Sequence, residues 1–209
     1  MSLKRIMCIV DGPTEIGALQ SKFKKQYYDC PEIRKGPGNG LDFSIQGYTK
    51  GVLPTIKLAL TSNIRAVILL PDLERRKETF RSFSDKLKAS IIEALLECTK
   101  LSKDSLQDTI FVCPPDIMFE NWIVCDIEGI RASKFINDDA IQDYYDGKNG
   151  ASILDKLMNT QYKKTVHGPL LFKSIREEVG IAYSNSFNDF IECLRTLIAK
   201  HCSNTYAND

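Results

Sequence analysis

Two short apolar runs, each ending in acidic residues, constrain the fold of this chain more than any other feature. The first run is IMCIV, followed by Asp11, and the second is AVILLP, followed by Asp72. Both are short and rich in β-branched residues, and both predict strands buried on two faces, as in the parallel sheet of an α/β domain. The carboxyl ends of such strands form the edge where open α/β sheets bind ligands. We therefore expect these acids at a ligand-binding edge.

The remaining pattern predicts an alternation of strands and helices in the first half of the chain. Strands are expected at residues 4–10, 42–48, 65–71 and 109–114, and helices at 14–26, from Pro54 to about 61, and at 79–100. This alternation is typical of a parallel sheet covered by helices. After this alternation, the pattern predicts a mostly helical second half. An apolar stripe near 186–200 predicts a last helix that packs against the core. The predicted fold class is α/β, with about four parallel strands in a core of residues 1–116 and a helical C-terminal extension, 117–209, packed on it.

Composition excludes several classes of protein. The 209 residues suit one domain, or one domain with a small appendage. Lys and Arg number 28 against 27 Asp and Glu, so any nucleic-acid contact needs a local basic patch rather than a global field. Seven cysteines without a C-x-x-C pair indicate neither a disulfide framework nor a zinc site. With no run of transmembrane length and no signal-peptide pattern, we expect a soluble, cytoplasmic protein with no membrane partner.

The first acidic motif, DGPTE, combines a turn with two carboxylates. Gly12 and Pro13 favour a sharp turn after the strand, which leaves Asp11 at the strand end and Glu15 one turn into a helix. Glu15 is explained equally well as a favourable acid in the first turn of that helix. Asp11 follows the apolar run directly and is the stronger candidate for a functional group.

The second acidic motif places Asp72 and Glu74 two residues apart. In an extended chain their side chains point to the same side, where two carboxylates raise each other's pKa. A Mg²⁺ or Mn²⁺ ion would neutralise them, since Mg²⁺ typically uses one or two carboxylates together with water and phosphate oxygens. The alternative is a solvated surface on which these acids pair with Arg75, Arg76 and Lys77.

Two later segments carry further candidate residues. In FENWIVCD, Trp122 is most simply a core residue, whereas Glu120 and Asp126 are either surface acids or, for Glu120, a carboxylate behind the metal ligands. In YKKTVHG, the side chains of Lys163, Lys164 and His167 could hold backbone phosphates, as could those of Arg75 and Arg76. A solvated loop explains any one of these basic residues equally well.

The order of these motifs resembles the Toprim fold of topoisomerases, DnaG-type primases and OLD-type nucleases. That family has a Glu and a Gly after its first strand and a D-x-D motif after a later one, which are matched here by Asp11 with Gly12 and by Asp72 with Glu74. More closely, the chain is similar to small stand-alone bacterial Toprim-like proteins of uncharacterised function. Their E-G-x-T-E start, D-x-D or D-x-E turn and E-x-W-x-x-x-D helix correspond to residues 11–15, 72–74 and 120–126.

The resemblance implies metal-dependent cleavage of a nucleic-acid backbone. Asp72 and Glu74 would hold Mg²⁺ or Mn²⁺ with Asp11, while Asp11 and Glu15 would serve in acid–base chemistry and Glu120 would lie behind them. It also implies an ABC- or SMC-like ATPase encoded nearby and a role in antiviral defence, as in a split OLD nuclease. The sequence has no G-x-x-x-x-G-K-[ST] motif, so the ATPase would be another chain.

Two other interpretations stay open at this stage. Asp11 stands where the family usually has Glu, and an Asp is one methylene shorter, so a degenerate scaffold that serves an ATPase as a partner or sensor is the alternative. A receiver or haloacid-type phosphatase ranks lowest. Such a phosphatase needs a second Asp two residues after the first, and here Gly12 and Pro13 follow Asp11.

Overall fold

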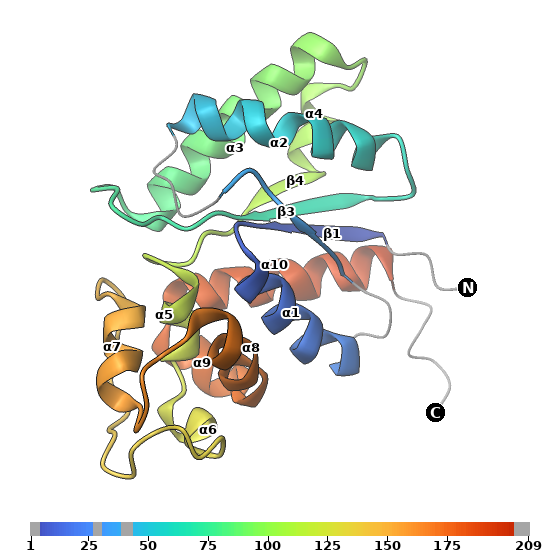
Figure 1. Cartoon of the computed structure of the whole chain (residues 1–209). Coiled ribbons are helices and arrows are strands. Elements are labelled where there is room, and N and C mark those ends of the chain that lie inside the picture. The colour runs from blue at the N-terminus through green and yellow to red at the C-terminus, as the bar shows by residue number, and fades with distance from the viewer. Residues whose placement is uncertain (1–4, 27–30, 39–43, 203–209) are drawn as a thin grey trace, which may run out of the picture.

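The computed structural model describes residues 5–26, 31–38 and 44–202, and it confirms the predicted α/β fold. Its sheet has four parallel strands in the order β2-β1-β3-β4 (Figure 1). The strands are β1 (Ile6–Val10), β2 (Glu32–Lys35), β3 (Ala66–Leu70) and β4 (Ile110–Val112). In the register of the two central strands, Val10 pairs with Leu70, so β1 and β3 end side by side.

Helices cover both faces of the sheet (Figure 1). The described helices are α1 (Pro13–Gln26), α2 (Ile45–Leu60), α3 (Phe80–Cys98), α4 (Lys103–Gln107), α5 (Phe119–Ile123), α6 (Ile127–Arg131), α7 (Gly150–Leu157), α8 (Lys164–Ser174), α9 (Glu177–Tyr183) and α10 (Asn185–His201). Because strand side chains alternate between faces, the even-numbered residues of β1 and β3 pack with α1, α8 and α10. Their odd-numbered residues pack with α2 and α3.

The C-terminal helices share a hydrophobic cluster with the sheet. The stripe on α10 that the sequence assigned to packing is buried against the same cluster as β1 and β3. Trp122 of α5 is fully buried there, stacked on Phe190 with ring centroids 4.8 Å apart, and its Nε1 donates to Ser186 Oγ. The interpretation of Trp122 as a core residue is thus confirmed, while the division of the chain after residue 116 stays a prediction.

Two predictions about the second βα unit are wrong. Residues 42 and 43 lie outside the described residues, but Ser44 caps α2 by accepting a hydrogen bond from Gly47 N, and residues 45–48 are helical. The strand is instead β2, which is at the sheet edge and half-exposed. Its sequence, EIRK, therefore carries little apolar signal. The side chains of Tyr48, Val52 and Ile56 form a buried stripe along α2, which the strand interpretation missed.

Pro54 lies inside α2 rather than in its first turn. A proline in a helix interior removes a hydrogen bond to the carbonyl four residues before it. Here Pro54 and Lys50 are both exposed, so water can satisfy that carbonyl. This exposure explains why the helix continues through the proline to Leu60.

The burial of Trp122 leads to a stability prediction. Trp122→Ala should lower the free energy of unfolding by roughly 3–5 kcal/mol, because it leaves a cavity against Phe190 and removes the hydrogen bond to the Ser186 hydroxyl. Urea unfolding followed by circular dichroism measures this change. The control is Leu58→Ala, since Leu58 is 73% exposed on α2 and should change stability by no more than about 0.5 kcal/mol. Equal losses for the two variants would contradict the packing described.

Candidate functional site

The first strand-end acid contacts the second directly. Asp11 follows β1, Asp72 follows β3 after Pro71, and Asp72 N donates a hydrogen bond to Asp11 Oδ2 at 3.0 Å. The register of β1 and β3 explains this contact, because the two strands end level with each other. The structure therefore brings together the two acids that the sequence placed at the carboxyl edge of the sheet.

Asp11 is held on both of its carboxylate oxygens. Tyr48 of α2 donates its hydroxyl to Oδ1 at 3.2 Å, while Oδ2 accepts the Asp72 N–H. A Cβ added at Gly38 would lie 2.5 Å from Asp11 Cγ, so only glycine fits at that position. Burial, and then the charge of Glu74, raises the pKa of Asp11 against the opposing effect of its hydrogen bonds.

Asp72 lies at the centre of the acidic residues. Its Oδ1 accepts a hydrogen bond from Phe119 N, the first residue of α5, at 2.9 Å. Burial raises the pKa of Asp72 well above its ordinary value, and the charges of Glu15, Asp11 and Glu120 raise it further. We call Asp11, Glu15, Asp72 and Glu120 the carboxylate cluster.

The two glutamates of the cluster differ in their partners. Among the described residues, Glu15 Oε2 is buried without a hydrogen-bond partner. Burial raises the pKa of Glu15, and the charges of Glu120 and Asp11 add to the shift. Glu120 is only 2% exposed, and its Oε1 accepts the Tyr162 hydroxyl at 3.2 Å. Glu120 is therefore not a surface acid but part of the same buried group.

Lys164 supplies positive charge to the cluster. It begins α8, and its Nζ lies 3.3 Å from Glu120 Oε1 while the side chain stays 56% exposed. Burial alone would lower the pKa of this ammonium, but the charges of Glu120, Asp72 and Glu15 outweigh it and raise the pKa. One lysine thus faces carboxylates contributed by three separate segments of the chain.

The segment after Asp72 differs from the extended chain that the sequence argument assumed. Glu74 has a left-handed backbone, with φ +52°, and its N–H donates to Ile117 O at 2.7 Å, so the chain is not extended through Glu74 as that argument assumed. Arg76 donates to the carbonyls of Asp72 and Leu73 and lies over the Phe83 ring, which ties down this loop. Arg75 is exposed.

The other candidate residues fall into two groups. His167 is buried against Phe135, and its Nδ1 accepts a hydrogen bond from Lys163 N, so its ring stabilises the start of α8 and does not face solvent. The side chain of Lys163 is exposed. Asp126 is also fully buried, contrary to the surface alternative, and it pairs with Arg176 and accepts from Gly129 N. It therefore serves the packing of the C-terminal helices.

Sequence reasoning missed the tyrosines that hold the cluster. Tyr48 was assigned to a strand that does not form, and Tyr162 lies in the quoted basic segment with no signal beyond its aromatic character. Within the described residues, no three His, Cys, Asp or Glu side chains are arranged as a ready-made metal site. Hard divalent cations such as Mg²⁺ commonly need only one or two carboxylates, with water completing the shell.

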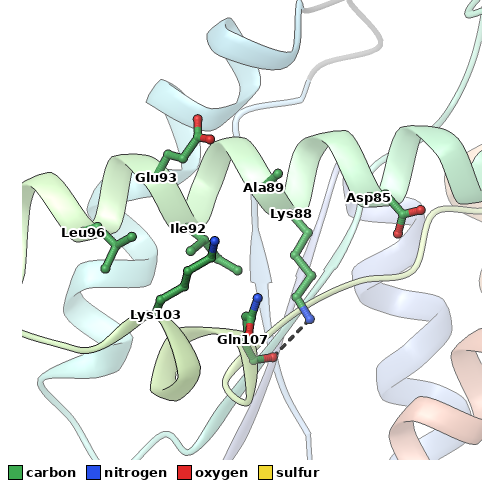
Figure 2. Close-up of a pocket in the computed structure, with 8 residues that line it drawn as sticks. All are labelled: Asp85, Lys88, Ala89, Ile92, Glu93, Leu96, Lys103 and Gln107. Carbon is green, nitrogen blue, oxygen red and sulfur yellow. Dashed lines mark hydrogen bonds between the residues drawn. The ribbon is translucent and has the colours of Figure 1, made fainter.

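A surface groove of about 550 Å³ lies away from the cluster, between α3 and α4 (Figure 2). Its lining mixes apolar Ile92 and Leu96 with the charged Lys88, Glu93 and Lys103. Figure 2 shows Lys88 donating to the carbonyl of Gln107, at 3.0 Å. No carboxylate of the cluster lines this groove. In the part of the chain that is described, no helix has the length and apolar character needed to cross a membrane.

Comparison with known proteins gives one distant structural match. No family model matches the chain, and no curated protein matches its sequence. Among solved structures, this chain is similar to the C-terminal region of the OLD protein of Xanthomonas campestris pv. campestris. The match covers 96% of this chain and 100% of the other chain. The two share 18% sequence identity, with a TM-score of 0.45.

The raised pKa values lead to a prediction about stability and pH. A carboxyl whose pKa is higher in the folded than in the unfolded chain favours folding only while protonated, so stability falls as pH rises through the folded pKa. Asp72→Asn removes this charge and should raise the free energy of unfolding at pH 7 by roughly 1 kcal/mol or more. This gain in the free energy of unfolding should become smaller towards pH 4, where Asp72 of the folded wild type is protonated.

Urea unfolding at both pH values, in chelator and without divalent cations, measures this difference. Glu97→Gln is the matched control, because Glu97 is an exposed carboxylate on α3. An Asp72→Asn protein that is less stable than the wild type at pH 7 would contradict this prediction. It would show that neighbouring groups stabilise the charged form of Asp72 in the folded protein.

Proposed function

We propose that this protein is a divalent-metal-dependent nuclease that hydrolyses phosphodiester bonds in nucleic acid. The observation that carries the proposal is the carboxylate cluster at the carboxyl edge of the parallel sheet. Burial and mutual repulsion raise the pKa of Asp11, Glu15 and Asp72, and Lys164 lies against the group. A cluster of this kind is costly for folding and is typical of functional sites.

The donor set fits a hard cation such as Mg²⁺ or Mn²⁺. All four side chains offer carboxylate oxygens, which these ions prefer, and Glu15 Oε2 has no partner among the described residues. Asp72 would hold the ion, with Asp11 and Glu120 beside it, while Glu15 stays free for proton transfer. Glu74 is close enough to raise the pKa of Asp11 and would act from the outer side. The bound ion would polarise a phosphoryl oxygen and stabilise the leaving oxygen.

The protein's own groups divide the remaining work. Glu15 is the better candidate for proton transfer, since its pKa is raised and its Oε2 has no hydrogen-bond partner among the described residues, whereas both oxygens of Asp11 accept hydrogen bonds. Asp11 then positions Asp72 through the backbone N–H. Lys164 is half-exposed and can donate to a phosphate oxygen.

Nucleic acid would bind through a local basic surface. Lys163 and Arg75 are exposed, and each is adjacent in sequence to a residue at the cluster, Lys164 and Glu74 respectively. His167 is buried and Arg76 bonds to its own loop, so neither belongs to the proposed surface. Phosphate contacts of this kind fix position without reading sequence.

The proposal extends to a partner. The resemblance to stand-alone Toprim-like proteins supports action with an ABC- or SMC-like ATPase on another chain, in the cytoplasm, as part of bacterial antiviral defence. The supporting observation is the sequence, which carries the three Toprim-like motifs and no ATP-binding P-loop. Co-purification of the chain with an ATPase encoded beside it tests this part of the proposal.

Metal binding is tested by calorimetric titration of Mn²⁺ and Mg²⁺. The wild type and Glu97→Gln should bind saturably, and Asp72→Asn should bind at least about tenfold more weakly, which corresponds to a loss of about 1.4 kcal/mol. Asp72→Asn is expected to be at least as stable as the wild type, and its urea unfolding curve checks that a loss of binding does not reflect unfolding. If all three proteins bind the ion equally well, the ion binds outside the carboxylate cluster.

Cleavage is tested on double-stranded DNA, single-stranded DNA and RNA with Mn²⁺. Glu15→Gln should slow cleavage by about 100-fold or more, as expected for the loss of a proton-transfer group, and Glu97→Gln should leave it unchanged. Activity that survives Asp72→Asn in full would belong to a contaminant, and the nuclease proposal would then lose its support.

One observation favours the alternative of a degenerate partner subunit. Both oxygens of Asp11 are engaged by Tyr48 and the Asp72 N–H, which is also the arrangement of a purely structural carboxylate. This alternative predicts no metal binding by the wild type, together with an ATPase complex that survives Asp72→Asn. The calorimetric titration therefore separates the two functions.

A further inference from the structure

Two cysteine thiols meet between the sheet and the last helix. Cys113 directly follows β4, and Cys193 lies in α10, 80 residues further along the chain. Each thiol shifts the pKa of the other, and Asp189, one helical turn before Cys193, lines a pocket with Cys113. Both cysteine side chains pack in the cluster between the sheet and α10. Neither sequence pattern nor spacing indicates this pair, because the two residues are brought together only by the fold.

The pair can be reached from solvent. Cys113, although buried, lines a pocket of about 230 Å³ together with Ser186 and Asp189 of α10. Arg81 of α3 makes a two-point ion pair with Asp189 at this pocket, at 2.9 and 3.0 Å, and both side chains are partly exposed. Cys193 is itself partly exposed. A small oxidant therefore has a route to the pair.

The surroundings make the two thiols unequal. The Cys113 thiol lowers the pKa of Cys193, and the charge of Lys88 lowers it further against the effect of burial. Lys88 donates a hydrogen bond to Gln107 O (Figure 2). Its ammonium also lies over the ring of Phe111. The Cys193 thiol, together with burial, raises the pKa of Cys113. Cys193 is thus the thiol that reacts as a thiolate, and Cys113 is a neighbour able to resolve the product.

We propose that Cys113 and Cys193 form a reversible disulfide when the protein meets hydrogen peroxide. The Cys193 thiolate attacks one peroxide oxygen, the O–O bond breaks, and hydroxide leaves, so that Cys193 becomes a sulfenic acid. The Cys113 sulfur then attacks the Cys193 sulfur and the S–O bond breaks. The oxygen leaves as water with the Cys113 proton. The pair is oxidised by two electrons and the peroxide is reduced to water and hydroxide.

The bridge would act on the segment that leads to the carboxylate cluster. Residues 114–118 connect Cys113 to α5, and this connection provides Ile117 O for Glu74 N and ends at Phe119 N, which bonds Asp72. A disulfide would tie the start of this connection to α10. The proposal itself concerns the bond and stands independently of the proposed nuclease activity.

Peptide mapping of the intact chain tests the proposal. Folded protein is treated with hydrogen peroxide, remaining thiols are alkylated, and the digest is compared with and without reductant. We expect a Cys113–Cys193 cross-linked peptide, lighter by two hydrogen atoms than its two halves, which disappears on reduction. Cys98→Ser should leave the cross-link unchanged, because Cys98 is exposed elsewhere on α3.

The variant Cys193→Ser is first checked for folding by circular dichroism. After peroxide treatment, Cys113 in this variant should still be alkylated to about 90% or more of the extent without peroxide, because a thiol that is protonated at neutral pH reacts slowly. The mapping of the wild type decides the matter even if this variant fails to fold. A bridge between Cys8 and Cys113, or stepwise oxidation of Cys193 to sulfinic acid without a bridge, would overturn the proposal.

Discussion

The hydrogen bond from Asp72 N to Asp11 Oδ2 is the contact on which the rest of the site depends. It exists because β1 and β3 are neighbours in register and end at the same level, so each strand delivers its acid to the same point. Strands buried on both faces leave little water at their ends, and the carboxylates there are desolvated as well as close together. Their raised pKa values follow from these two causes.

The cluster is completed by the C-terminal half of the chain. Glu120 arrives on α5, whose first N–H also bonds Asp72, and Lys164 arrives at the start of α8. Both helices lie on the face of the sheet that α1 and α10 cover, in one continuous hydrophobic cluster. The burial of Trp122 against Phe190 therefore holds in place the helix that carries Glu120. Packing and charge are coupled, because the same helices supply both.

The sequence predicted the parts of the fold that carry strong periodic signals, and it missed those that depend on tertiary contacts. The buried runs of β1 and β3 and the long stripes of α3 and α10 are visible as patterns, and so is the meeting of Asp11 with Asp72. The edge strand β2 carries mixed polar residues, and residues 45–48 alternate between apolar and polar by chance within a helix. The left-handed turn at Glu74, the burial of His167 and the tyrosines that bond Asp11 and Glu120 are set by neighbours distant in sequence.

The central claim is that the carboxylate cluster is built for a cation. A crystal structure grown with Mn²⁺, with data collected at a wavelength where manganese scatters anomalously, tests it most directly. The account predicts an anomalous peak within coordination distance of Asp72, about 2.0–2.3 Å from a carboxylate oxygen of that residue. A map with no peak there at saturating Mn²⁺, or with the ion bound only elsewhere, would contradict the account and assign the cluster to a structural role.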